Sequence, residues 1–470
     1  MFFNFESIQH QFDPVITGFK TRDVRFPTSL DQTGSDAMND VGDYSAAFCI
    51  LETDSSHQLA QTGHGMTFTI GRGNDLVVQA IPYFASALVG HSLSALVNNF
   101  AATWKALTRD CQVRWVGPEK GITHLAFGAV INAIWDLWAK SANRPVWKLV
   151  ADLTPEEFVR CVPFDYIEDA ITPKEATELL TQVSGGGKKE RLEDALNDRA
   201  VPIYTTSAGW LGYSDEKMCQ LLDENRRAGV KNFKFKVGRD LQEDRKRLSL
   251  ARDIIGYDDT TKFMIDANQV WSVPQAISYV KELAEFKPWF IEEPTSPDDI
   301  LGHATIRCSL KDLGIGVATG EMCQNRIVFK QLLQAEAMDV CQVDACRMGG
   351  LNEVLAVLLM AAKFDVQVVP HSGGVGLPEL TQHLSLIDYI CVSGRVSLLE
   401  YVDHLHEHFQ YPSMTKDGYL ISPMEPGYSV EMVQEGMDRY TFPPLNKDGW
   451  WASDEARQVL DRQAIKLPRP

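Results

Sequence analysis

Three short apolar runs decide the fold of this sequence: Phe233-Lys-Phe-Lys-Val237, Phe263-Met-Ile-Asp266 and Trp289-Phe-Ile-Glu292. Aromatic and β-branched residues dominate the three runs, as they do in strands, and helical stretches separate them. Strands that alternate with helices in this way indicate βα units and a parallel sheet. We therefore expect an α/β fold in this part of the chain.

Five further runs have the same character and extend the series in both directions. They are Val201-Pro-Ile-Tyr-Thr205, Ile315-Gly-Val-Ala-Thr319, Val340-Cys-Gln-Val-Asp344, Val366-Gln-Val-Val-Pro-His371 and Val396-Ser-Leu-Leu-Glu400. Eight runs in succession predict a closed (β/α) barrel over residues 200–400.

The first third of the chain has a different pattern. Strand-like runs with Gly and Pro turns occupy residues 22–69, and residues 121–150 keep a helical spacing of apolar side chains. This part is predicted to be α+β. Between Ser184 and Arg191, the run Ser-Gly-Gly-Gly-Lys-Lys-Glu-Arg predicts a flexible linker or mobile loop.

An ionisable side chain stands at or just past the end of seven of these runs. The seven are Lys236, Asp266, Glu292, Glu321, Asp344, His371 and Glu400, separated by 30, 26, 29, 23, 27 and 29 residues. Each separation is about one βα unit, so successive strands would bring one such group each to the same rim. The C-terminal rim of the strands is where barrel enzymes build their active sites.

Three of these groups are carboxylates from successive strands: Asp266, Glu292 and Glu321. A single carboxylate here would be interpreted as a helix N-cap or a surface ion pair. Three that converge repel one another unless a cation lies among them. Because all the donors are hard oxygens, the trio favours Mg²⁺.

Lys234 and Lys236 lie two residues apart, so they share one face of a strand. Taken alone, such a strand would have one solvent-exposed face. In a barrel, one face of each strand points into the interior and the other is covered by helices, so neither is fully exposed to solvent. Mutual repulsion and burial would lower the pKa of one lysine, and the nearby carboxylates would oppose this. Asp344 is placed to orient His371, and either Lys236 or His371 is a candidate base for removing a proton next to a carboxylate.

Several motifs resemble the mandelate-racemase-type enolase superfamily. They are Lys-Phe-Lys at 234–236, Ile-Asp-Ala-Asn at 265–268, Ile-Glu-Glu-Pro at 291–294, Thr-Gly-Glu at 319–321 and Pro-His-Ser-Gly-Gly at 370–374. Runs at 25–30, 34–38, 115–120, 205–213 and 293–300 are similar to those of the L-fuconate dehydratases and the fungal L-galactonate dehydratases. The likeness covers about residues 17–455.

The resemblance implies a (β/α)7β, TIM-like barrel (200–400) with an α+β capping domain (17–185) and a C-terminal segment (401–460) that returns to the cap. It implies Asp266, Glu292 and Glu321 as Mg²⁺ ligands, Lys236 as the base at C2, and His371, oriented by Asp344, as the acid at the C3 hydroxyl. The product would be a 2-keto-3-deoxy sugar acid, formed through an enediolate. It also implies two further catalytic residues, Lys234, which would hold the substrate carboxylate, and Glu400, which would hydrogen-bond near the enediolate. The implied substrate contacts are Gly34, Ser35, Asp36 and Tyr44 of the cap with Lys234, Asn268, Glu321, Ser372, Gly373 and Glu400 of the barrel.

This sequence departs from the family pattern at three places. The first sixteen residues are an extension, and the stretch from Ser55 to Gly65 is longer than expected. Asp165 stands where the resemblance predicts arginine, and we expect this exchange to affect substrate preference. L-Fuconate is the 6-deoxy counterpart of L-galactonate, and the fungal likeness favours L-galactonate.

The formal net charge of −18 and the pI near 5.1 disfavour binding to nucleic acid or to an anionic membrane. No apolar run is expected to reach the roughly 20 residues of a membrane span. The first residues lack the pattern of a signal peptide, and the nine scattered cysteines are expected to be reduced thiols. We expect a cytoplasmic homo-oligomer that acts on a small acid sugar.

Three other functions remain open at this point. A racemase or epimerase of a 2-hydroxy acid would use the same lysine and histidine. The alternation of His404, His406 and His408 is compatible with a zinc hydrolase, although a helical return segment explains it as well. A non-catalytic homologue is the third alternative, because a fold does not fix a function.

Overall fold

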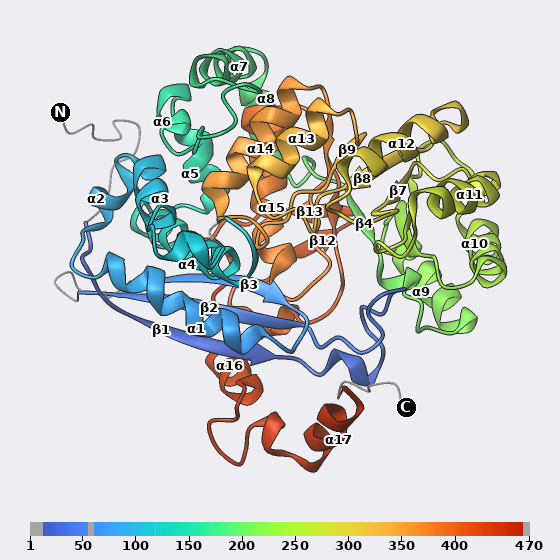
Figure 1. The fold of residues 1–470 in the computed structure, drawn as a ribbon, viewed down its shortest axis with the longest axis horizontal. Helices are drawn as coiled ribbons and strands as arrows, with labels where there is room; N and C mark the ends of the chain where they lie inside the picture. Colours follow the sequence, from blue (N-terminus) through green and yellow to red (C-terminus); the bar gives the residue numbers. More distant parts are fainter. Residues whose placement is uncertain (1–12, 55–60, 118, 464–470) are drawn as a thin grey trace.

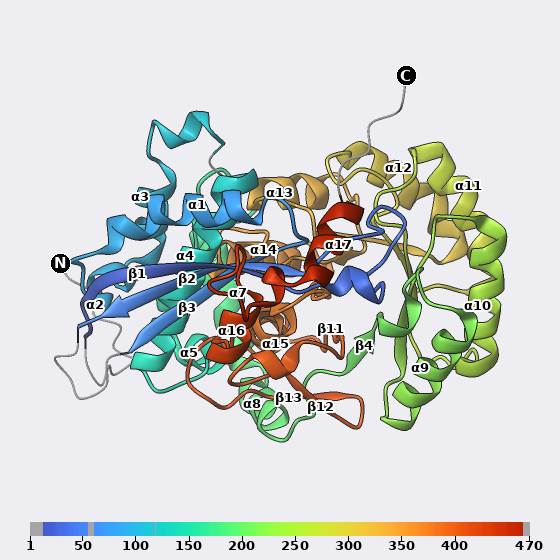
Figure 2. The same ribbon diagram turned by 90° about the horizontal axis from the view of Figure 1, so that it is seen from below.

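The computed structural model of the chain describes residues 13–54, 61–117 and 119–463. The expectations for the start of the chain, and part of the one for Ser55 to Gly65, lie outside the described residues. An antiparallel sheet with its helices, coloured blue to cyan, lies beside a curled parallel sheet with its helices, coloured green to orange (Figures 1 and 2).

The cap is built on three antiparallel strands in the order β1 (Ile16–Arg25), β2 (Ser45–Thr53) and β3 (Thr62–Thr69). One face of this sheet carries α4 at very close range. A Cβ atom on Gly65 of β3 would lie 2.1 Å from the carbonyl oxygen of Ala129 in α4, so only glycine permits this approach. The remaining elements of this part are α1 (Asn74–Ala85), α2 (Leu93–Val97), α3 (Phe100–Thr108), α4 (Gly121–Ser141), α5 (Val146–Asp152), α6 (Pro155–Val159), α7 (Pro173–Gly185) and α8 (Lys188–Leu196).

Eight parallel strands form the second sheet, in the order β10-β9-β8-β7-β6-β5-β4-β11. Their bounds are β4 (Ile203–Thr205), β5 (Asn232–Lys236), β6 (Phe263–Asp266), β7 (Phe290–Glu292), β8 (Gly316–Thr319), β9 (Val340–Cys341), β10 (Gln367–Val368) and β11 (Leu399–Glu400). Each of the eight apolar runs therefore contains a strand. The predicted barrel with an α+β cap is confirmed.

Helices follow the strands and cover the outside of the barrel. They are α9 (Asp215–Arg227), α10 (Leu241–Ile255), α11 (Val273–Leu283), α12 (Ile300–Leu310), α13 (Arg326–Gln334), α14 (Leu351–Lys363) and α15 (Leu377–Ile387), the last continued by a π-helical turn (Asp388–Val392). Between β10 and β11 the seam is bridged by side chains: Gln367 Nε2 donates to the Val396 carbonyl at 3.3 Å, and the Ser397 hydroxyl donates to the Val368 carbonyl.

The interior of the barrel is a ring of side chains from successive strands. Its apolar members are Tyr204, Met264, Phe290, Ala318, Val340, Val369 and Leu398. On β5, Lys234 pairs in register with Met264, so a lysine stands where an apolar side chain is expected. Phe233 and Phe235, on the opposite face of β5, pack into the outer core, as the alternation predicted.

The rest of the chain returns to the cap. It contains the hairpin β12 (Met414–Lys416) and β13 (Tyr419–Ile421), then α16 (Gln434–Tyr440) and α17 (Asp454–Gln463). The Phe442 amide donates to the Asp23 carbonyl of β1 at 2.8 Å. In Figure 1, α16 and α17 are seen below the cap sheet, on the side away from the hairpin.

Two sequence predictions are wrong. The predicted linker from Ser184 to Arg191 is mostly helical, because α7 extends to Gly185 and α8 begins at Lys188. Residues 186–187 form a tight turn in which Gly187 adopts φ +87°, and Arg191 donates to the carbonyls of Val183, Gly186 and Ile390. One described helix, α4, has the length and apolar composition of a membrane span, although no such run was expected. Its apolar window is 89% buried inside the protein, as in a core helix.

Candidate active site

The three predicted carboxylates meet at the C-terminal ends of adjacent strands. Asp266 ends β6, Glu292 ends β7 and Glu321 lies two residues after β8, and one oxygen of each lies within 4.8 Å of the others. Burial, and then the charge of Asp266, raise the pKa of Glu292 to about 8. Because Glu292 Oε1 has no hydrogen-bond partner among the described residues, the trio fits a bound cation with hard-ligand preference.

Lysines on β5 neutralise part of this negative charge. Lys234 Nζ lies 2.7 Å from Glu292 Oε2, and Lys236 Nζ lies 2.5 Å from Asp266 Oδ2 and 2.9 Å from Asn268 Oδ1. Burial lowers the pKa of both lysines, but Glu292 acting on Lys234 and Asp266 acting on Lys236 raise it more. We expected the pKa of one lysine to be lowered, but the carboxylates raise the pKa of both. Both side chains are therefore ammonium ions in this arrangement.

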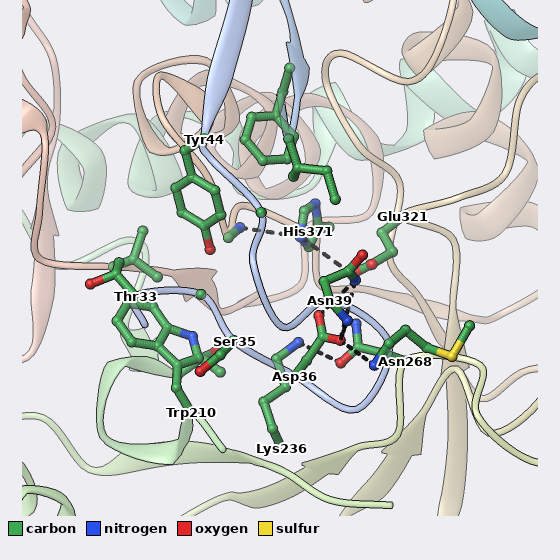
Figure 3. A pocket seen from close by; sticks show the side chains of 18 of the residues that line it. Thr33, Ser35, Asp36, Asn39, Tyr44, Trp210, Lys236, Asn268, Glu321 and His371 are labelled. Carbon is green, nitrogen blue, oxygen red and sulfur yellow. Dashed lines mark hydrogen bonds and ion pairs between the residues drawn. The ribbon is translucent and has the colours of Figure 1, made fainter. Parts of the chain in front are cut away.

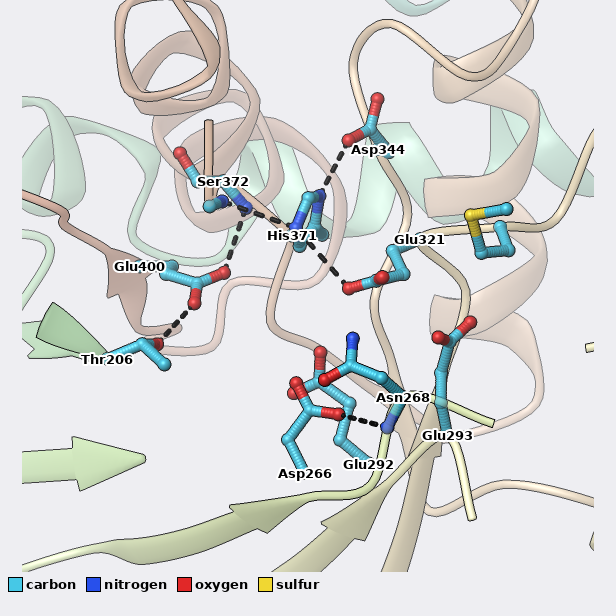
Figure 4. Close-up of polar contacts among 12 residues, drawn as sticks. Thr206, Asp266, Asn268, Glu292, Glu293, Glu321, Asp344, His371, Ser372 and Glu400 are labelled. Atoms are coloured by element: carbon cyan, nitrogen blue, oxygen red, sulfur yellow. Dashed lines mark hydrogen bonds and ion pairs between the residues drawn. The ribbon is translucent and has the colours of Figure 1, made fainter. Parts of the chain in front are cut away.

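Across the barrel, His371 lies between two carboxylates (Figure 4). Its Nδ1 lies 2.7 Å from Asp344 Oδ2 and its Nε2 lies 3.3 Å from Glu321 Oε2. Burial lowers the pKa of His371, but the charges of Glu321 and Asp344 raise it by more, so the net pKa is about 9. His371 is therefore protonated at neutral pH and can donate a proton.

A third group completes the barrel floor. Glu400 accepts hydrogen bonds from the Thr206 hydroxyl and from the Ser372 amide at 3.0 Å, and its Oε1 lies 3.0 Å from Lys234 Nζ. Burial would raise the pKa of Glu400, but Lys234 and His371 lower it below its usual value. Glu400 stays negative, and Ser372 contributes its backbone amide to hold it.

A cavity of about 420 Å³ opens between the barrel rim and the cap. Of the predicted site residues, Gly34, Ser35, Asp36, Tyr44, Lys236, Asn268, Glu321, Asp344, His371, Gly373 and Glu400 line it. Figure 3 shows Lys236 and His371 on opposite sides of the space, with Glu321 beside His371. Lys234, Asp266, Glu292 and Ser372 do not line the cavity, and their side chains are fully or almost fully buried.

The cap contributes through residues 28–43, which we call the capping loop. Asp36 Oδ1 accepts hydrogen bonds from the amides of Met38 and Asn39, both at 2.7 Å, so this carboxylate shapes the loop. Gly34 has φ +77°, and a Cβ atom there would lie 2.2 Å from the Tyr44 hydroxyl oxygen. Glycine at position 34 therefore lets the loop and Tyr44 close over the same space.

Comparison with known proteins places the chain in a family. Residues 217–436 match the family model described as Enolase C-terminal domain-like. The chain is 64% identical over 450 residues to the L-galactonate dehydratase of Hypocrea jecorina, covering 96% of this chain and 99% of that protein. The chain belongs to the enolase superfamily.

Solved structures of this superfamily have the same architecture. Human mitochondrial enolase superfamily member 1 is 49% identical, with a TM-score of 0.89 over 93% of this chain and 98% of that one. L-Talarate dehydratase of Polaromonas sp. JS666, solved with Mg and L-glucarate, is 22% identical, with a TM-score of 0.67 over 91% and 97% of the two chains. The second likeness concerns the fold alone.

Several lining residues of this enolase superfamily member were not predicted from the sequence, among them Arg72, Trp210, Met322 and Arg347. Arg347 follows Asp344 by three residues, so the strand-end rule that selected Asp344 could have included it. Its Nε donates to the Glu321 carbonyl at 3.3 Å. Arg72 reaches the cavity from the cap, ahead of α1, and no motif indicates it.

The unexpected Asp165 does not line the cavity. Its carboxylate pairs with Lys105 at 2.9 Å and with Arg109 at 2.8 Å, and its carbonyl accepts from Arg326 Nε at 3.1 Å. Asp165 thus connects cap helix α3 to barrel helix α13. Asp165 therefore has no direct contact with the cavity through which it could affect substrate preference as expected.

The three alternating histidines do not converge on a metal site. His404 packs between the rings of Tyr44 and Trp210, with centroid distances of 5.5 Å to each. His406 Nδ1 lies 2.6 Å from Glu379 Oε1, and His408 stacks on Phe26 at 4.8 Å. Among residues 13–54, 61–117 and 119–463, the acidic trio is the group whose ligand atoms gather closely enough to hold a metal ion.

Proposed function

We propose that this protein is an Mg²⁺-dependent dehydratase that converts L-galactonate into a 2-keto-3-deoxy sugar acid. The observation that carries the proposal is that Lys236 and His371 face one cavity from opposite sides, and that Glu321 of the acidic trio also lines it. The 64% identity to an L-galactonate dehydratase supports the substrate. The hard oxygen ligands, and the Mg in the Polaromonas structure, support the metal.

The reaction needs one proton removed and one delivered. Lys236, once it has released its own proton, takes the proton at C2 of the substrate, and Asn268 holds its Nζ by a hydrogen bond of 2.9 Å. His371 gives its proton to the C3 hydroxyl, which leaves as water. The resulting enol then tautomerises to the 2-keto-3-deoxy acid. When bound, Mg²⁺ supplies positive charge that stabilises the anion formed from the substrate carboxylate.

The cap side of the cavity favours a polyol chain. Asn39, Asp40 and Arg72 present polar groups there, in addition to Ser35 and Asp36. Such groups can bind hydroxyls beyond C3, including the C6 hydroxyl that L-fuconate lacks. We therefore expect L-galactonate to be converted with a higher kcat/KM than L-fuconate.

Product analysis tests the proposal directly. The protein is incubated with Mg²⁺ and a library of five- and six-carbon aldonates, and 2-keto-3-deoxy acid is measured. We expect keto acid from L-galactonate above all. An epimer without keto acid would support the racemase alternative, and the absence of any turnover would support the non-catalytic one.

From the sequence arguments we also propose that the protein is a cytoplasmic homo-oligomer. Light scattering of the purified protein and fractionation of expressing cells check both points. A monomer, or protein confined to an organelle, would contradict this proposal.

A further inference from the structure

We infer that helix α17, through Gln463, belongs to the substrate-binding apparatus and that Gln463 is a positioning residue for the capping loop. The loop carries Ser35 and Asp36 into the cavity, whereas α17 lies outside it. Both ribbon views place α17 beside the blue segment that follows β1 (Figures 1 and 2). Only the expected change in KM rests on the proposed function; the structural role of Gln463 does not.

The two ends of the capping loop meet at a narrow neck. The Ser29 amide donates to Asp43 Oδ1 at 3.1 Å, and the Thr28 hydroxyl donates to the Gly42 carbonyl at 3.2 Å. The Tyr44 amide donates to the Thr28 hydroxyl oxygen at 3.0 Å. The neck therefore fixes the angle at which the loop leaves the cap sheet.

Gln463 contacts both sides of this neck from α17. Its Nε2 lies 2.6 Å from Asp43 Oδ2, 3.1 Å from the Val41 carbonyl oxygen and 3.4 Å from Ser29 Oγ. Asp43 is 1% exposed, so its carboxylate depends on the donors that surround it. One oxygen of Asp43 is held by the loop and the other by α17.

The helix that presents Gln463 is itself anchored to the cap. Trp451, just before α17, donates from Nε1 to the Arg25 carbonyl of β1 at 2.9 Å. Trp451 also packs with Ala456 and Val459 of α17. Because Arg25 ends the strand that leads into the capping loop, the helix and the base of the loop form one unit.

Beside the contacts of Gln463, α17 and the capping loop separate. A second cavity of about 340 Å³ lies between them, lined by Ser29, Gln32 and Asp40 of the loop and by Val459, Arg462 and Gln463 of the helix. The outer side of the loop therefore lacks continuous packing here, and point contacts hold the loop in place. Gln463 at the neck is one, and the Ser35 hydroxyl oxygen, which accepts from the Gly212 amide at 2.9 Å, is another.

A pair of matched substitutions tests this role. In Q463K the ammonium can still donate to Asp43 Oδ2, whereas in Q463E a second carboxylate faces this oxygen and position 463 no longer supplies a donor. Both replacements are good helix formers of similar size. For Q463E we expect faster amide hydrogen exchange in residues 28–43 and a KM for L-galactonate raised about tenfold, with kcat within about twofold, because the closed loop is less populated. Q463K should stay close to the parent in both measurements.

The two readouts separate this inference from the proposed function. If the parent turns over no aldonate, the proposed function fails, and hydrogen exchange still decides the role of Gln463. Equal exchange rates in the parent, Q463E and Q463K would overturn the inference. Equally faster exchange in residues 28–43 of both variants would show a general effect on the helix and would overturn the inference as well.

Discussion

The Nδ1 atom of His371 lies 2.7 Å from Oδ2 of Asp344, and the other oxygen of Asp344 accepts the amides of Cys346 at 2.6 Å and Arg347 at 2.8 Å. The backbone thus fixes the carboxylate, and the carboxylate fixes the ring. A histidine held in this way keeps one tautomer and one orientation, and it gains basicity from the neighbouring charge.

Replacing Asp344 by Asn tests that relationship. Asparagine keeps an oxygen for the two amides but removes one of the two charges beside His371 and turns an NH2 group toward Nδ1, so the preferred tautomer changes and the pKa of His371 falls. We expect dehydration of L-galactonate to fall about 100-fold or more, the range for loss of a general acid. Steady-state formation of keto acid measures this. Mg²⁺ affinity, measured by calorimetry, should not change, and normal turnover in D344N would refute the assignment of His371 as the acid.

The metal assignment depends on Glu292 rather than on its neighbour Glu293. Both are fully buried, but Glu293 Oε2 accepts from Gln269 Nε2 at 2.7 Å, whereas Glu292 belongs to the trio. For E292Q we expect Mg²⁺ affinity to fall by more than about 100-fold, beyond the usual loss for an outer-sphere partner. The matched control E293Q should lose less than about tenfold. Isothermal titration with Mg²⁺ compares the two, and the reverse order would show that the trio is misassigned.

The buried carboxylate of Glu353 joins the cap to the barrel. Glu353 of α14 accepts from Arg326 NH1 at 2.8 Å and lies 2.7 Å from His124 Nε2 on α4. Burial alone would raise the pKa of Glu353, but His124 and Arg326 lower it to about 2. Replacing Glu353 by Gln removes the buried anion beside Arg326 and His124, so we expect a loss of about 3–5 kcal/mol in the free energy of unfolding.

Urea titrations monitored by tryptophan fluorescence measure this loss. R457Q serves as the control, because the Arg457 and Asp454 side chains are 74% and 88% exposed, and exposed pairs contribute little. No measurable change is expected for R457Q. A stability of E353Q equal to that of R457Q would show that Glu353 does not hold cap and barrel together.

Local sequence predicted the site better than it predicted the contacts between the two parts of the molecule. The trio could be located because each ligand follows a strand, and the period of a βα unit brings strand ends together. The His124 partner of Glu353 and the partners of Gln463 lie more than 200 residues away in sequence, so no periodicity indicates them. At Ser184 to Arg191 the three glycines predicted a linker, whereas the segment is mostly helical and contacts Ile390, which local sequence does not indicate.

A buried acid far from the trio gives a pH dependence that can be measured separately. Asp388 is 2% exposed, its Oδ2 accepts from the Ser393 hydroxyl at 2.7 Å, and its Oδ1 has no hydrogen-bond partner among the described residues. Burial raises the pKa of Asp388 from 3.8 to about 7. The folded state therefore binds this proton more tightly than the unfolded state. The contribution to stability is fully present below pH 3.8 and is lost as the pH rises through 7.

D388N removes this titration and keeps a similar shape, so its stability relative to the parent should increase with pH. Between pH 5 and pH 8 we expect the difference in free energy of unfolding to shift in favour of D388N by roughly 3 kcal/mol, since each pKa unit corresponds to about 1.4 kcal/mol. Paired urea titrations at the two pH values measure it, and all other titrating groups cancel in the difference. A difference independent of pH would mean that Asp388 is ionised in the folded protein at both values. The Ser393 hydroxyl and the charge of Arg395 would then outweigh burial, because these are the two influences that lower the pKa of Asp388.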